Sequence, residues 1–306
     1  MTWFPEFGQV IHEAAHLGQL GHLQAAEAAL YSGNPTRLLE AFPGGVRIDD
    51  PRLGRVEGAA SLTEFCRESG KWQKEHDGRP RPIAVTNGQT RVVGEFDLAL
   101  TADGREFVLP VAVVVEPDAA RRSVWIRIYH SQWPLLGHHV VRAPLLARDP
   151  SVVESDVVGE YQAALAAGDA ARITATFEPD GCFREPAGPQ FRRCGTDVLR
   201  KFFTRFFSAG GGIILEHCSV TEDGVRTALE FNASGGAGTT CPVRPASPCM
   251  SAVPADGCAR RGSTTMSRGQ SSSGPLTRPA TGRRPRKIAP TGPRRTSRGP
   301  GSVPRW

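Results

Sequence analysis

Two stretches of the chain show the same succession of hydrophobic and polar positions. In each, an apolar helical pattern ends at a glycine, a shorter helical pattern follows, and a strand-like segment then ends in an acid and a proline. Gly33 and Pro51 are 18 residues apart, and so are Gly168 and Pro186. Self-similarity at a fixed spacing indicates an internal duplication. The pattern predicts the following parts: a first domain at 12–137, a linker at 138–151, an incomplete second domain at 152–232 and a tail at 233–306.

The first domain is predicted to be helical at its start and stranded afterwards. Helical patterns cover 12–31, 36–42 and 60–66, and a polar loop is expected at 75–82. Strands are then expected at 90–100, 106–116 and 123–131, the last because apolar and polar residues alternate there with a period of two. The dipeptides Asn87-Gly88 and Asp103-Gly104 are typical of hairpin turns. Helices followed by antiparallel strands predict an α+β fold rather than a doubly wound sheet.

The second stretch, Tyr161 to Phe207, carries a family resemblance. A helical pattern ends at Gly168-Asp169, a short one ends at Phe177, the strand-like CFRE segment runs into Pro186, and an aromatic helical pattern closes the stretch. This order resembles the start of a SnoaL-like domain of the nuclear-transport-factor-2-like superfamily. The resemblance implies cone-shaped domains in which helices pack on a curved antiparallel sheet, here two in tandem.

The second domain lacks the end that the first one has. Two strands are expected at 213–221 and 225–232, after which the chain turns to Gly, Pro, Ser and Arg without periodicity. Residues 236–306 hold 13 Lys and Arg but a single acid, Asp256, whereas 1–235 hold 24 basic and 30 acidic residues. Such a composition predicts a disordered basic tail. The mildly acidic remainder argues against a specific nucleic-acid-binding domain.

A shifted reading frame is one explanation of the tail. Written in GC-rich codons and read two bases later, residues 245–268 can encode an apolar strand, a glycine-rich turn and a second strand that ends in acids. The alternative is a genuine basic tail that contacts nucleic acid non-specifically through phosphates. Sequencing the gene across codons 230–245 separates the two. A domain that lacks strands has an open edge and an exposed face, which favours a homodimer through the sheet face.

The cysteine spacing and the lengths of the apolar runs indicate the cellular compartment of the protein. Four cysteines of the body and three of the tail stand at irregular spacings without a CxxC pair, which suits a reducing compartment better than a disulfide framework. No apolar run approaches the ~20 residues of a membrane span, and no secretory signal pattern opens the sequence. We therefore expect a cytoplasmic protein that does not enter a membrane.

The resemblance also implies candidate site residues. Ketosteroid isomerase, a relative in the superfamily, has a helix tyrosine seven residues before the Gly-Asp pair and an acid before the proline at the strand end. Tyr161 and Glu185 match these positions in the second domain, and Asp50 matches the acid in the first. Ala26 stands where the first domain should have its tyrosine, and Val113 where a further acid would fall. Neither domain holds the full set.

The chemistry requires a carboxylate in apolar surroundings, where desolvation raises its pKa. His130, at the end of a strand, is a candidate partner of Asp50. The alternative is that the acids before proline cap turns or pair with Arg47 and Arg184, and that His130 is a solvated strand-end residue. His12 and His16 have metal-ligand spacing, but no further ligand completes a site. We expect no cofactor and no metal.

Two functional hypotheses follow. The first is a domain that binds a small apolar molecule in its cone and acts on it as a cofactor-independent isomerase, cyclase or hydratase. The second is a non-catalytic module for ligand binding or dimerisation. The two differ in whether Asp50 and His130 lie together in one apolar interior.

Overall fold

The computed structural model describes residues 20–137, 140, 142–154, 156–185, 188, 191–235 and 244–245. All of them belong to one compact unit, Met1–Ser263. Most of the predicted tail at 233–306, the helical segment before residue 20 and parts of the predicted linker lie outside the described residues. The described residues form an α+β fold of two helix-and-sheet assemblies, the first at 20–136 and the second at 156–235 together with 244–245.

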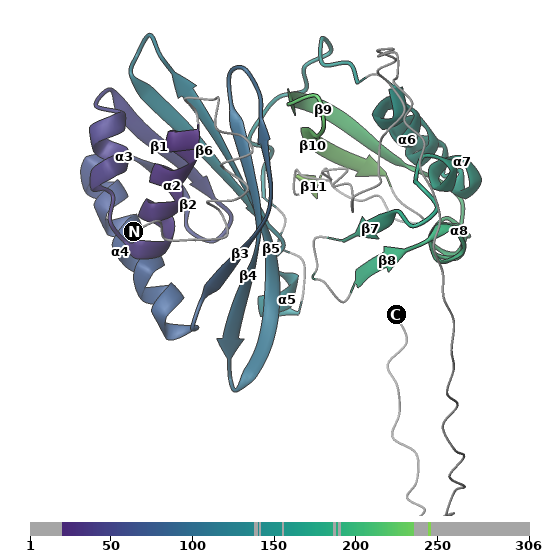
Figure 1. Cartoon of the computed structure of the whole chain (residues 1–306), viewed down its shortest axis with the longest axis horizontal. Helices are drawn as coiled ribbons and strands as arrows, with labels where there is room; N and C mark the ends of the chain where they lie inside the picture. Colours follow the sequence, from purple (N-terminus) through teal and green to yellow (C-terminus); the bar gives the residue numbers. More distant parts are fainter. Residues whose placement is uncertain are drawn as a thin grey trace, which may run out of the picture. The chain divides into compact units, whose positions relative to one another are not determined.

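The first assembly places its helices against one face of a sheet (Figure 1). The helices α2, α3 and α4 span Leu20–Ser32, Thr36–Ala41 and Ala59–Glu75. Gly33 ends α2 with a φ of 73°, and a Cβ on Gly70 of α4 would come 3.1 Å from the Gly33 Cα. The two helices therefore cross closely at two glycines. α4 is longer than the sequence pattern predicted because its second half is amphipathic and buries Ser69, Gly70 and Gln73.

Six strands form the sheet of the first assembly in the order β2-β1-β6-β5-β4-β3. Only β1 and β6 run parallel; all other neighbours are antiparallel. The strands span Gly45–Asp50 (β1), Gly54–Glu57 (β2), Arg79–Asn87 (β3), Val92–Ala102 (β4), Arg105–Asp118 (β5) and Ser123–His130 (β6). A short helix, α5 (Trp133–Leu136), follows.

The predicted hairpin turn at Asp103-Gly104 is confirmed. Ala102 pairs with Arg105, so the loop holds two residues, and both have positive φ angles of 50° and 70°. This is the turn whose twist matches that of the flanking strands. The predicted polar loop at 75–82 was wrong in its second half, because β3 starts at Arg79 and pairs with β4 there.

Alternation along each strand divides the sheet into two chemically different faces. On β6, Val124, Ile126 and Ile128 join the core beneath the helices, whereas Arg127 and Tyr129 point to the opposite face. β4 and β5 alternate in the same way. The helix-side core therefore fills one face, and the other face carries both charged and apolar residues, including Arg127 and Tyr129.

The second assembly repeats the order of elements. Its elements are α6 (Asp156–Ala167), α7 (Ala170–Ala175), β7 (Cys182–Arg184), β8 (Arg192–Cys194), α8 (Thr196–Phe206), β9 (Ile213–Glu222), β10 (Thr227–Gly235) and β11 (Arg244–Pro245). In both assemblies two helices precede a strand hairpin, a third helix and further strands. The N-cap glycines of α4 and α8 also share a conformation: Gly58 has φ 85° and ψ 153°, and Gly195 has φ 87° and ψ 147°.

The strands of the second assembly separate into a pair, β7-β8, and a three-stranded sheet in the order β11-β10-β9. Aromatic side chains of α8 dominate its core, with Phe203 2% exposed. The expectation that no strand follows β10 needs a correction, because Arg244 and Pro245 pair with Ala233 and Asn232.

Asp169 is the N-cap of α7. Its Oδ1 accepts hydrogen bonds from the backbone N–H groups of Ala171 and Arg172, each at 3.0 Å. We expect Asp169→Ala to lower the free energy of unfolding by about 1 kcal/mol, because it leaves these N–H groups without their acceptor. Urea denaturation checks this. Asp169→Asn should keep most of the stability, and equal losses in both variants would contradict the capping role.

The face of the first sheet that is turned away from its helices contacts β10 of the second assembly. Tyr129, Val93, Ala112 and Val114 form a small buried cluster with Ala228. Beside it, Glu230 accepts hydrogen bonds from Arg127, Tyr129 and Ser219 at 2.5–2.7 Å. Through Ala228 and Glu230 of β10, these contacts within one chain cover part of the second assembly's sheet face, which was expected to mediate a homodimer.

The cysteine spacing argued against a disulfide framework, but the described part of the chain contains one disulfide. Cys182 and Cys194 form a disulfide between β7 and β8, while Cys66 and Cys218 are free and buried. The irregular spacing in the sequence did not indicate this pair because the pairing arises across a hairpin.

Candidate functional site

Asp50 lies at the end of β1, on the side of the sheet that the helices cover. The residue is 7% exposed. Its Oδ1 accepts hydrogen bonds from the backbone N–H groups of Arg52 and Leu53 at 2.7 and 2.8 Å, so it holds the turn between β1 and β2. This is the turn-capping role considered for an acid before proline. The predicted partner Arg47 instead pairs with Asp49, on the opposite face.

His130 ends β6 on the same face, because it continues the alternation of Ile126 and Ile128. Burial lowers the pKa of His130 to about 4, although the Asp50 carboxylate acts in the opposite direction. The imidazole is therefore neutral at physiological pH. Because the charge of Asp50 acts on the pKa of His130, the two predicted residues of the first assembly interact electrostatically.

Glu27 and Tyr31, on α2, belong to the same neighbourhood. They are four residues apart, so both lie on one side of the helix. Burial raises the pKa of Glu27 to about 8. Burial also raises the pKa of Tyr31 well above its ordinary value, and the charges of Glu27 and Asp50 raise it too. Oε1 of Glu27 has no hydrogen-bond partner among the described residues. A protonated carboxyl group thus faces an apolar interior.

Sequence reasoning did not identify Glu27 and Tyr31. The position seven residues before Gly33, where the family resemblance implies a tyrosine, is Ala26. The available signal was an acid inside an Ala- and Leu-rich helical pattern, with a tyrosine one turn later. An isolated acid on the apolar side of a helix is a candidate for a shifted pKa.

Arg52, Trp72 and Gln132 lie around these groups. The Arg52 guanidinium stacks 4.0 Å from the Trp72 ring centroid, and its charge acts on the pKa of both Tyr31 and His130. Gln132 Nε2 donates to the Pro51 carbonyl at 2.8 Å, which ties the end of the sheet to the β1–β2 turn. The arrangement combines a donor carboxyl group, a carboxylate, a neutral imidazole and a cation at the end of an apolar core.

The two predicted residues of the second assembly have structural contacts. Tyr161, on α6, packs edge to face on Phe177 at 5.8 Å. Glu185, just after β7, pairs with Arg193 at 2.6 Å, and the Arg193 guanidinium also lies over the Phe202 ring. The anticipated alternative partner, Arg184, instead pairs with Asp97. A joint role of Tyr161 and Glu185 stays a prediction.

A second histidine, His217, has a carboxylate partner. Nδ1 of His217 on β9 lies 2.6 Å from Oε2 of Glu154, whose side chain is 4% exposed. Glu154 stands before α6, more than 60 residues away in the sequence. No local pattern around His217 indicates this partner, because Glu154 comes from a distant segment of the chain.

The described part of the chain contains no group of three or more His, Cys, Asp or Glu side chains that could hold a metal ion. None of its helices is long and apolar enough to cross a bilayer.

The chain was compared with known proteins. A solved protein described as NTF2-like, from Cytophaga hutchinsonii, is 15% identical over 36% of this chain and 97% of its own, with a TM-score of 0.30. An NTF2-like protein from Anabaena variabilis is 18% identical over 42% and 93%, also with a TM-score of 0.30. A SnoaL-like protein from Burkholderia thailandensis is 18% identical over 37% and 97%, with a TM-score of 0.28.

No curated protein matches the chain. The family model of the SnoaL-like domain matches residues 158–256. This match extends beyond residue 232, where the sequence pattern placed the end of the second domain. The resemblance predicted from the Gly-Asp and acid-Pro motifs is confirmed for this segment: residues 158–256 carry a SnoaL-like domain match.

Proposed function

We propose that the chain is a tandem pair of SnoaL-like domains and that the first binds a small, mostly apolar molecule between α2 and the sheet. The repeated order of elements and the matching N-cap glycines support the duplication. The core of the first assembly is mostly apolar, and Glu27 and Asp50 are among the polar side chains buried in it. A ligand with an apolar body and one polar oxygen suits such an interior.

The burial of Glu27, whose Oε1 has no hydrogen-bond partner among the described residues, supports a catalytic role, because burial raises its pKa to about 8. A carboxyl group that stays protonated at neutral pH can donate a hydrogen bond to an oxygen on which negative charge develops. Asp50 and the neutral His130 supply basic groups for the proton that is removed. The reaction class is proton abstraction next to a carbonyl, as in cofactor-independent isomerisation or cyclisation.

This role predicts solvent-proton exchange in small apolar ketones. In D2O, the protein should catalyse deuterium incorporation next to the carbonyl of some members of a ketone panel, followed by NMR. Glu27→Gln and Asp50→Asn should each slow the exchange by about 100-fold, the usual contribution of a positioned acid or base. Glu40→Gln, which removes a carboxylate from an exposed position, should leave the rate unchanged.

A non-catalytic ligand-binding module is the second candidate. The hydrogen bonds from Arg52 and Leu53 to Asp50 favour it, because they assign that carboxylate a structural task. Under this alternative, members of the panel raise the melting temperature without any exchange. Both candidates are refuted if no ketone of the panel raises the melting temperature and none exchanges a proton.

A further inference from the structure

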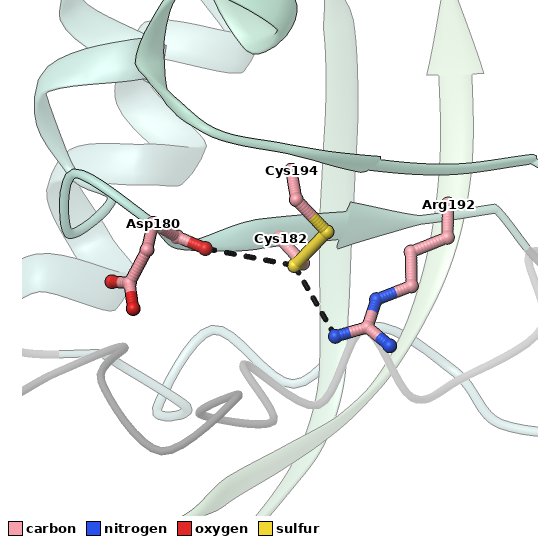
Figure 2. Close-up of a disulfide and its surroundings, with 4 residues drawn as sticks. All are labelled: Asp180, Cys182, Arg192 and Cys194. Carbon is pink, nitrogen blue, oxygen red and sulfur yellow. Dashed lines mark hydrogen bonds between the residues drawn. A yellow bond between two sulfur atoms is a disulfide. The ribbon is translucent and has the colours of Figure 1, made fainter. Parts of the chain in front are cut away.

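The β7–β8 hairpin of the second assembly carries an accessible disulfide (Figure 2). Cys182 and Cys194 face each other in the register of the two strands, which pair over three residues each. Cys194 is exposed and Cys182 is half-buried. A thiol in solution can therefore approach the bond from the Cys194 side.

The first assembly has an ion pair at the corresponding place. In its hairpin, Arg47 lies opposite Glu57, with Arg47 Nε 3.6 Å from Glu57 Oε1. In both hairpins this cross-strand pair is the one next to the glycine that caps the following helix. The ion pair of the β1–β2 hairpin does not depend on redox conditions, whereas the disulfide of the β7–β8 hairpin does.

Arg192 makes the two sulfur atoms chemically unequal. Its Nη2 donates to Cys182 Sγ at 3.3 Å (Figure 2). Cys182 Sγ also lies 3.7 Å from the Asp180 carbonyl oxygen, a contact that becomes a hydrogen bond only after reduction gives the sulfur a proton. A guanidinium next to a cysteine favours its thiolate form, and a better-stabilised thiolate leaves faster in exchange.

We propose that Cys182 and Cys194 form a reversible thiol–disulfide exchange site for a dithiol, in which Arg192 makes Cys182 the leaving group. The dithiol's thiolate attacks Cys194 Sγ, the S–S bond breaks, and Cys182 departs as a thiolate beside Arg192. The dithiol's second thiolate then attacks the mixed disulfide and releases Cys194. The dithiol loses two electrons and becomes a disulfide, while its two protons pass to the released cysteines.

Reduction has a structural consequence within the same hairpin. Phe183 of β7 packs against Phe202 and Phe203 of α8, with ring centroids 5.5 and 5.3 Å apart. The disulfide fixes the hairpin that presents Phe183 to this cluster. We expect reduction to lower the melting temperature by roughly 5 to 10 °C, as the loss of a native crosslink does in small domains.

The experiment uses the full chain after air oxidation. Peptide mapping should find Cys182 and Cys194 joined, dithiothreitol should separate them, and removal of the reductant should restore the bond. After a brief exposure to glutathione and an acid quench, the mixed disulfide should be on Cys194 and the free thiol on Cys182. Arg192→Ala should slow the reduction about 3- to 10-fold, and Arg192→Lys should restore part of the rate.

Arg200→Ala provides the matched control, since it removes an arginine from an exposed position of α8 in the same assembly. It should reduce at the rate of the unaltered protein. The proposal is overturned if Cys182 and Cys194 remain unpaired after oxidation, or if glutathione is found on Cys182. Equal reduction rates for the Arg192→Ala and Arg200→Ala variants would overturn the assignment of Arg192.

Discussion

Replacing Glu230 by alanine should lower the free energy of unfolding by about 3 to 5 kcal/mol, the range for breaking a buried ion pair. Arg127 is fully buried, and its Nε and Nη2 donate to the two Glu230 carboxylate oxygens at 2.5 and 2.7 Å. Burial alone would raise the pKa of Glu230, but the hydrogen bonds and charge of Arg127 outweigh it and lower the pKa. Without Glu230, the guanidinium and the hydroxyl groups of Tyr129 and Ser219 lose an acceptor. Urea denaturation measures the loss.

A double variant shows how much of the stability loss comes from leaving Arg127 as an unpaired buried charge and how much from lost packing. Replacing Arg127 and Glu230 together by methionine should recover most of the stability, because no charge is then left buried and unpaired. Glu116 limits the loss in the single variant, since its Oε2 lies 2.7 Å from Arg127 Nη1. If Glu230→Ala were as stable as the unaltered chain, the contact between β6 and β10 would not contribute to the fold.

Replacing Glu27 by glutamine should stabilise the protein at high pH and not at low pH. The folded chain keeps the Glu27 proton up to a pKa of about 8, whereas the unfolded chain loses it near the ordinary value of 4.5. The folded state therefore binds more protons between these values, and the stability of the unaltered protein falls as the pH rises through this window. Removing the carboxyl group should recover roughly 3 to 5 kcal/mol at pH 8 to 9.

The measurement is the free energy of unfolding of both proteins at pH 5 and pH 8.5. The difference between them should grow with pH. Glu40→Gln should shift the stability by the same small amount at both pH values, because residue 40 is exposed. A constant difference for Glu27→Gln would show that Glu27 has an ordinary pKa, which would remove the main support for a donor carboxyl group.

Much of the fold was predictable because its determinants are local. The apolar alternation on β6 and the Asp103-Gly104 turn depend on neighbours within a few residues, and the Gly168-Asp169 pair ends one helix and caps the next. The same local order carried the resemblance to the SnoaL-like domain, which the match at 158–256 confirms. Asp50 was placed correctly beside a turn for the same reason.

The candidate site was predictable only in part. Asp50 and His130 lie on one face because strand alternation fixes the side to which each points. Glu27 and Tyr31 were missed because their pKa shifts arise from the burial of these α2 side chains in the folded chain, which no local sequence pattern reports. The partner of Glu185 was also wrong: Arg193 comes from the neighbouring strand, whereas the sequence offered the adjacent Arg184.

The sequence by itself determined most of the helices and strands, the Asp103-Gly104 turn and the apolar side of β6, since these follow from backbone preferences and periodicity. The tertiary structure alone decided which distant side chains meet: Cys182 with Cys194, His217 with Glu154, and Arg127 with Glu230. Such pairs form across strands or between assemblies, so no local sequence pattern identifies the partners. Burial then sets the charge of each group, because desolvation depends on everything packed around it.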